Sequence, residues 1–111
     1  MRGYVCLIAR RHVIELHDFT DDETVAFMRD VRRVSRAVAS TVHPVKLNVE
    51  LHGNTIPHLH VHLFPRYRGD PFEGRPIDPR AVKHAVYAPG ELASLRAAVV
   101  RALGEHAAQR T

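Results

Sequence analysis

The chain has 111 residues, of which 45% are hydrophobic and 25% charged, and its formal net charge is +4 at pH 7. This length and composition predict one globular domain over residues 1–111, and no apolar run approaches the roughly 18 residues that a membrane-spanning helix needs. The N-terminus lacks the pattern of a signal peptide, so we expect a cytoplasmic protein that does not enter a membrane.

The positive charge is carried mostly by arginine, and its placement bears on the partner. Four arginines recur at helical spacing, which we interpret as the solvated face of a helix: Arg29, Arg32, Arg33 and Arg36. The chain has only three Tyr and four Phe, and these are not interleaved with the basic residues. The aromatic residues that usually stack on bases are therefore sparse, and the balance favours a small anionic ligand over a polynucleotide.

The segment Tyr4–Ala9 is a short apolar, partly β-branched run that predicts a buried strand ending at the basic cluster 10–12. Cys6 lies inside this run and is the only cysteine, so it cannot form an internal disulfide. We expect it to be a small buried core residue.

Residues 20–41 predict a helix. Thr20 and Glu23 have the spacing of a capping box, acidic residues crowd the first turn, and Pro44 lies just beyond the end. An apolar stripe repeats at helical spacing: Phe27, Val31, Val34 and Val38.

Two alternating segments follow, residues 46–52 and 58–64, with Gly53-Asn54 as a turn signal between them. In the first, Leu47, Val49 and Leu51 are expected to face the core. In the second, the apolar positions are Leu59, Val61 and Leu63, opposite His58, His60 and His62. We therefore expect an antiparallel pair with Asn48 on the same face as the histidines.

Residues 66–89 are rich in proline and glycine and predict an irregular surface loop. Residues 89–109 close the chain as a predicted helix with an apolar stripe of Leu92, Leu95, Val99 and Leu103.

Three histidines at alternate positions allow three interpretations. They could form a solvated strand face. They could also be neutral ligands of zinc or iron, but no carboxylate lies within the motif: Glu50 is the nearest on that face, and nothing in the spacing requires His52 as a further ligand. They could also include a nucleophile that attacks phosphorus, because neutral imidazole is well populated at cellular pH. Asn48, Asn54 and Thr55 could then stabilise charge on the phosphoryl oxygens.

The motif His-φ-His-φ-His-φ-φ, with φ apolar, is matched at all seven positions of 58–64, and the chain here resembles the histidine triad (HIT) family of nucleotide hydrolases and transferases. Arg11-His12 resembles the end of an upstream strand of that family, and 53–55 resembles its Gly-Gln-Ser/Thr turn. Pro65-Arg66, together with Gly-Asn in place of Gly-Gln, resembles a bacterial branch.

The resemblance implies an α+β fold, with an antiparallel sheet, a long helix packed on it and a C-terminal helix, assembled as a homodimer. It implies attack on the α-phosphate of a nucleoside phosphoramidate or dinucleoside polyphosphate through a nucleotidyl-histidine intermediate. It also implies that no cofactor is required and that the protein itself binds no metal, although Mg²⁺ could arrive on a polyphosphate substrate.

The same resemblance assigns roles to individual residues. His60 would be the nucleophile, His62 would contact phosphate oxygens, and His58 would orient His60 through a hydrogen bond. The residues that would bind substrate are Asn48, Asn54, Thr55 and, at the rim, His12.

Two features depart from the family pattern. Members generally carry more chain before the strand at 4–9, and this additional segment contacts the base and ribose. Three explanations are open: the pocket is more open, other residues or a partner subunit cover the nucleoside, or the true start lies upstream. Asn54 is also one methylene shorter than Gln. Two alternatives remain at this stage: a protein that binds nucleotides without turnover, and a three-histidine metalloprotein.

Overall fold

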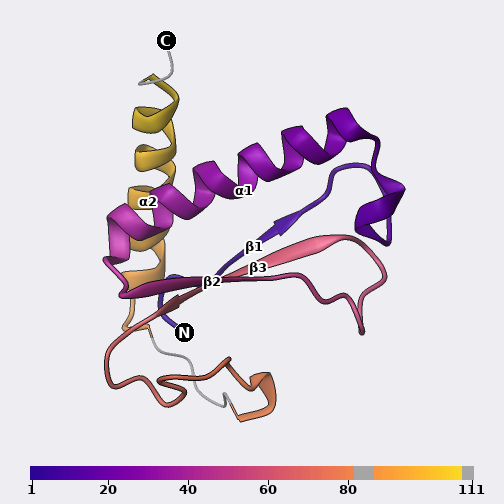
Figure 1. Ribbon diagram of the computed structural model, residues 1–111. Helices are drawn as coiled ribbons and strands as arrows, with labels where there is room; N and C mark the ends of the chain where they lie inside the picture. Colours follow the sequence, from indigo (N-terminus) through magenta and orange to yellow (C-terminus); the bar gives the residue numbers. More distant parts are fainter. Residues whose placement is uncertain (82–86, 109–111) are drawn as a thin grey trace.

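A computed structural model describes residues 1–81 and 87–108, which form an α+β fold with a three-stranded antiparallel sheet. The strand order is β1-β3-β2. Figure 1 shows α1 along one face of this sheet, α2 crossing the end of α1, and the segment after β3 on the opposite face. The elements are β1 (Val5–Ile8), α1 (Asp21–Val42), β2 (Lys46–Glu50), β3 (His60–Arg66) and α2 (Glu91–Ala108), with 3-10 turns at Leu16–Asp18 and Pro79–Ala81.

Strand β1 forms where it was predicted, but two expectations about it were wrong. The strand is half-buried rather than buried, with Ile8 65% exposed, and Cys6 is not a core residue. Val5 and Leu7 pack against the core, so the alternation of the strand sends Cys6 to the other face. Cys6 pairs across the strands with His62 and is only half-buried. The core thus contains no cysteine, and the single thiol lies beside the histidines.

Helix α1 confirms the predicted capping box. Thr20 Oγ1 accepts a hydrogen bond from Glu23 N at 3.2 Å, and Glu23 Oε1 accepts one from Thr20 N at 3.0 Å. The helix ends at Val42 and is capped by His43, which has a left-handed backbone (φ 50°) directly before Pro44. The apolar stripe packs on the sheet and on α2, and the arginines are exposed apart from the half-buried Arg33.

The predicted antiparallel pair is confirmed, with β2 and β3 joined by a nine-residue connection over 51–59. Asn48 lies opposite Phe64, which places it on the histidine face as predicted. Gly53 has a φ of +93° within the connection, a conformation that favours glycine. The expected burial of Val49 and Leu51 was wrong: Val49 is 52% exposed because β2 is an edge strand, and Leu51 lies beyond its end.

Helix α2 packs on α1 through Leu95 and Val99, which contact Val38 and Val42. Leu92, expected in the same stripe, is 57% exposed, because the helix contacts α1 only from its second turn onward. Residue 109, the last residue of the helix predicted from the sequence, lies outside the described residues. Neither α1 nor the described part of α2 is long and apolar enough to cross a membrane.

Candidate active site

The three histidines lie at the start of β3. His60 and His62 belong to the strand, and His58 lies in the connection just before it. The apolar residues that alternate with them are fully buried in the core: Leu59, Val61 and Leu63. The predicted alternation is therefore confirmed, and the interior side of the strand anchors the histidines on its other side.

The ring of His60 is fixed by the backbone. Its Nδ1 lies 2.7 Å from the carbonyl oxygen of His58. A carbonyl oxygen can only accept, so Nδ1 of His60 carries a proton and donates it. In the neutral ring the free electron pair is then on Nε2.

His58 and His12 form a second pair behind His60. Nε2 of His58 donates to the carbonyl oxygen of Ala9 at 2.6 Å, which leaves Nδ1 of the neutral ring as an acceptor. Nδ1 of His12 lies 2.9 Å from that atom and donates to it. The hydrogen bond that orients His60 thus comes from the His58 backbone, while the His58 ring ties the motif to the end of β1.

His62 is held by a tyrosine that precedes β1. Tyr4 Oη lies 2.7 Å from Nδ1 of His62, and the rings of His60 and His62 meet edge to face with centroids 4.8 Å apart. Burial, followed by the charges of His60 and His52, lowers the pKa of His62 below its usual 6.5, with Glu50 acting in the opposite direction. The surroundings of His62 therefore favour its neutral form.

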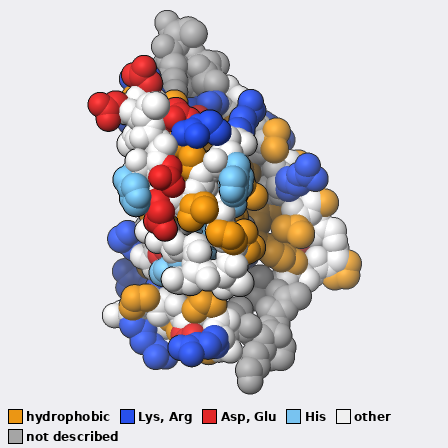
Figure 2. Space-filling view, turned by 90° about the vertical axis from the view of Figure 1, so that its right-hand side faces the viewer, with side chains coloured by type: hydrophobic (Ala, Val, Ile, Leu, Met, Phe, Trp, Pro, Cys, Tyr) orange, Lys and Arg blue, Asp and Glu red, His pale blue; other side chains and the backbone are white. Residues whose placement is uncertain are grey.

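A cavity of about 730 Å³ opens over this end of the sheet. Figure 2, which faces this end, shows hydrophobic side chains around a hollow next to histidine. Among the predicted site residues, His60, His62, Asn54 and Thr55 line the cavity, whereas His58, His12 and Asn48 do not. The remaining lining residues are Met1, Tyr4, Glu50, His52, Gly53, Ile56, Phe64, Pro76, Ile77 and Pro79.

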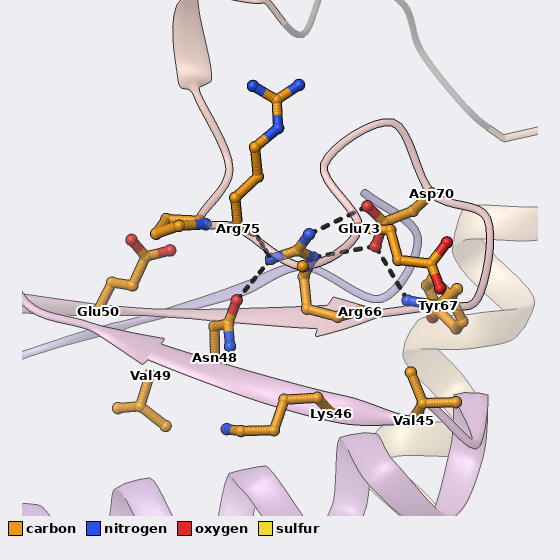
Figure 3. Close-up of a pocket in the computed structure, with 12 residues that line it drawn as sticks. Val45, Lys46, Asn48, Val49, Glu50, Arg66, Tyr67, Asp70, Glu73 and Arg75 are labelled. Carbon is orange, nitrogen blue, oxygen red and sulfur yellow. Dashed lines mark hydrogen bonds and ion pairs between the residues drawn. The ribbon is translucent and has the colours of Figure 1, made fainter.

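Asn48 lines a neighbouring cavity of about 600 Å³ instead. In Figure 3 it points toward the segment after β3, on the same side of β2 as Glu50, and its Oδ1 accepts a hydrogen bond from Arg66 Nη1 at 2.8 Å. Its amide oxygen is thus bound to Arg66 and lies away from the histidine cavity.

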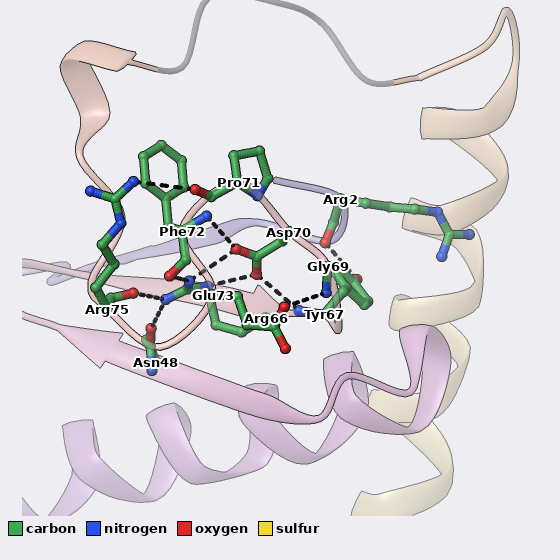
Figure 4. A network of polar contacts seen from close by, with 10 residues as sticks. All are labelled: Arg2, Asn48, Arg66, Tyr67, Gly69, Asp70, Pro71, Phe72, Glu73 and Arg75. Atoms are coloured by element: carbon green, nitrogen blue, oxygen red, sulfur yellow. Dashed lines mark hydrogen bonds and ion pairs between the residues drawn. The ribbon is translucent and has the colours of Figure 1, made fainter.

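Arg66 ties the segment after β3 to the sheet, and only 7% of this residue is exposed. Its guanidinium donates to both carboxylate oxygens of Asp70 at 3.0 Å and to the carbonyls of Phe72 (2.6 Å) and Arg75 (2.7 Å), as Figure 4 shows. Hydrogen bonds from Arg66, together with those from the backbone of Tyr67 and Phe72, lower the pKa of Asp70 to about 2. This network fixes the loop from which Pro76 and Ile77 reach the histidine cavity.

Sequence reasoning missed Tyr4, Phe64 and the loop residues as parts of the site. Period-two alternation already grouped Tyr4 with Cys6, and Phe64 with the histidines. The missing information was the register of β1 against β3, which pairs Cys6 with His62.

Within residues 1–81 and 87–108, no group of three or more His, Cys, Asp or Glu side chains is arranged to hold a metal ion. Both ring nitrogens of His58 are engaged by Ala9 and His12, so the three motif rings do not converge on one point.

Fold and site together define a histidine triad protein. The model of the HIT domain matches residues 1–69, and the chain belongs to the HIT family. It is similar in structure to a histidine triad protein from Bradyrhizobium japonicum, with 29% identity, a TM-score of 0.83, and coverage of 90% of this chain and 75% of that one. A Zn-bound histidine triad family protein from Mycobacterium smegmatis is 29% identical, with a TM-score of 0.62 and coverage of 91% and 71%.

Curated relatives are similar to part of this chain in sequence. Protein hit of Bacillus subtilis is 30% identical over 77 residues, which are 64% of this chain and 53% of that protein. An AP-4-A phosphorylase of Mycobacterium tuberculosis is 34% identical over 74 residues, which are 61% of this chain and 38% of that protein. The chain thus spans about half or less of the length of these relatives.

Proposed function

We propose that this protein hydrolyses or transfers nucleotidyl groups, attacking the α-phosphate of a nucleoside phosphoramidate or dinucleoside polyphosphate with His60. The observation that carries the proposal is the hydrogen bond from His60 Nδ1 to the His58 carbonyl, because it leaves the electron pair of Nε2 for attack. A relative named for AP-4-A phosphorolysis, and one from Schizosaccharomyces pombe named bis(5'-nucleosyl)-tetraphosphatase, support this class of substrate.

The reaction would take two steps. Nε2 of His60 attacks the α-phosphorus, a P–N bond forms, and the bond to the amine or phosphate leaving group breaks with protonation of that group. Water or another acceptor then attacks the same phosphorus and loses a proton. The P–N bond breaks, its electron pair returns to Nε2, and the nucleotide is released.

The neighbouring groups would stabilise charge. With Tyr4 donating to Nδ1, neutral His62 would present an Nε2–H to a phosphoryl oxygen. Asn54 and Thr55, exposed at the cavity wall, would donate to the phosphate or leaving group. His58 and His12 would act by holding the backbone behind His60, and Asn48 by holding Arg66.

A homodimer is part of the proposal. Edge strand β2 carries exposed apolar residues, Val49 on the strand and Val45, 60% exposed, just before it. Edge strands with unpaired backbone groups readily pair with a second copy, and burying valines there would stabilise the pair.

Release of AMP from adenosine phosphoramidate tests the function. Wild-type protein should release AMP with EDTA present, whereas cleavage of a dinucleoside polyphosphate should slow when Mg²⁺ is removed from that substrate. Nucleotide binding without any turnover would favour a non-catalytic binder. Stoichiometric zinc or iron in the purified protein, with activity lost on its removal, would favour the metalloprotein.

A further inference from the structure

A histidine outside the motif shares the cavity with His60. His52 lies two residues beyond the end of β2, and it lines the cavity together with Glu50, the last residue of that strand. The antiparallel register pairs Glu50 with His62, so the chain that continues to His52 runs in the direction of His60. The ring centroids of His52 and His62 are 6.1 Å apart. His52 therefore lies beside the motif, although the two steps of the proposed reaction do not use it.

Glu50 fixes the orientation and the tautomer of the His52 ring. Nε2 of His52 lies 3.2 Å from Oε1 of Glu50. An ionised carboxylate can only accept, so Nε2 carries a proton and donates it, and in the neutral ring the free electron pair is on Nδ1. The side chain of Glu50 is 20% exposed and that of His52 is 56% exposed. The carboxylate is thus held at the cavity wall, while the imidazole lies where water enters.

The second step of the proposed reaction needs a group that takes a proton from water. Imidazole is the side chain that most often acts as a general base near neutral pH. His60 cannot take this proton in the intermediate, because its Nδ1 proton is bound to the His58 carbonyl and its Nε2 is bonded to phosphorus. His62 is proposed to donate to a phosphoryl oxygen. Among the described histidines that line the cavity, this leaves His52.

We propose that His52, oriented by Glu50, is the general base that activates water against the nucleotidyl group on His60. This inference rests on the proposed function. Nδ1 of His52 takes a proton from water while the water oxygen attacks the α-phosphorus. A P–O bond forms, the P–N bond breaks, and its electron pair returns to Nε2 of His60. The His52 imidazolium, paired with the Glu50 carboxylate, then releases its proton to solvent.

The choice of acceptor distinguishes a general base from a residue that only shapes the cavity. Inorganic phosphate in its dianionic form can attack phosphorus without losing a proton, so it does not need His52. A substitution that merely distorts the cavity, or that acts through His62, would slow transfer to water and to phosphate alike. Loss of the base alone slows transfer to water and leaves transfer to phosphate in place.

The p-nitrophenyl ester of AMP separates the two steps, because p-nitrophenolate leaves without being protonated. Wild type and His52→Gln should form the His60 adduct at similar rates in stopped-flow measurements of p-nitrophenolate, which also shows that the variant is folded. The adduct of His52→Gln should decay in water roughly 100-fold more slowly, the size of a general-base contribution. With phosphate added, the share of ADP over AMP among the products should rise in the variant.

Two further variants complete the experiment. Glu50→Gln should slow adduct decay in water less than His52→Gln does, because the base remains and only its charged partner is lost. His17→Gln, at an exposed histidine in the turn before α1, should behave as wild type. Wild-type decay in His52→Gln, equal slowing of adduct formation and decay, or an unchanged share of ADP would overturn the role of His52. Absence of any adduct in wild type would instead overturn the proposed function.

Discussion

The carbonyl oxygen of His58 accepts a hydrogen bond from Nδ1 of His60 at 2.7 Å. The tautomer of the proposed nucleophile is therefore set by main chain, which no side-chain substitution at position 58 removes. The His58 ring has a separate task, joining Ala9 and His12 at the end of β1.

Substitutions at the two positions should therefore differ in severity. His60→Ala should lower kcat for AMP release by at least roughly 10⁴-fold, the order seen when a nucleophile is removed. His58→Ala keeps the carbonyl and should lower kcat by only about 10- to 100-fold through looser positioning. Equal loss in the two variants, measured with adenosine phosphoramidate, would contradict the backbone role.

Tyr4→Phe should separate the hydrogen bond between Tyr4 and His62 from the stacking of their rings, whose centroids are 5.8 Å apart. Loss of one hydrogen bond worth about 1 kcal/mol should lower kcat roughly five- to tenfold, because Nδ1 of His62 loses the partner that favours an Nε2–H tautomer. Affinity for AMP should stay within about twofold, because the Tyr4 ring that lines the cavity remains. Steady-state kinetics and calorimetry on one preparation check both parts, and an unchanged kcat would remove Tyr4 from the proposed mechanism.

His52→Ala should raise the pKa of His62. That pKa is lowered first by burial and then by the charges of His60 and His52, so removing the His52 side chain opens the site and takes away one repelling charge. It also frees the Glu50 carboxylate, which lies 3.2 Å from Nε2 of His52.

Nuclear magnetic resonance titration of the imidazole signals measures this change directly. His17→Ala, at an exposed position in the turn before α1, is the control and should leave the His62 titration in place. A pKa of His62 that stays the same or falls in His52→Ala would contradict the electrostatic account.

Asp70→Asn should destabilise the protein in a manner that depends on pH. The substitution leaves buried Arg66 without its charge partner and should cost about 3 kcal/mol of unfolding free energy at pH 7. The folded-state pKa of Asp70, about 2, lies below its usual 3.8, so the stabilisation is present above 3.8 and is lost as the pH falls through 2.

Urea unfolding of wild type and Asp70→Asn across this range measures the difference. The gap between the two proteins should be constant from pH 7 to about pH 5 and shrink below about pH 4. Asp78→Asn, at an exposed carboxylate paired with Arg80, should change stability by less than about 1 kcal/mol. A gap that does not depend on pH would show that the charge of Asp70 is not what stabilises the loop.

Val49→Lys should prevent the proposed dimer by placing a charge on edge strand β2. Light scattering after size exclusion should give a dimer for wild type and a monomer for Val49→Lys at micromolar concentration. Ile14→Lys, at an apolar residue 49% exposed in the segment after β1, should remain a dimer. A monomeric wild type would remove the homodimer from the account.

The sequence predicted the parts of the fold that follow from local periodicity. The capping box of α1, the alternation of 58–64 and the pairing of β2 with β3 could all be predicted, because their signals lie close together in the sequence. The positions of Cys6, Val49 and Leu92 were not, because burial there depends on which elements lie alongside. Residues on an edge strand or at a helix end can follow the apolar periodicity and still be exposed, because no neighbouring element packs on them.

The same limit applies to the candidate site. The motif was enough to predict His60 and His62 as site residues. Tyr4, some 58 positions away from His62, joins them only through the pairing of β1 with β3. The Arg66–Asp70 pair is close in sequence, but its carbonyl partners at Phe72 and Arg75 depend on how the loop folds back. A proline-rich segment gives little periodicity from which to predict such a turn.

Intact mass spectrometry after brief mixing with adenosine phosphoramidate shows directly whether His60 becomes nucleotidylated. The protein is stripped of metal, mixed, quenched in denaturant and weighed beside His60→Ala treated in the same way. We expect a transient increase equal to one adenylyl group in wild type, mapped to His60, and none in the variant. Product formation without an adduct at any time point, or an adduct that persists in His60→Ala, would contradict it.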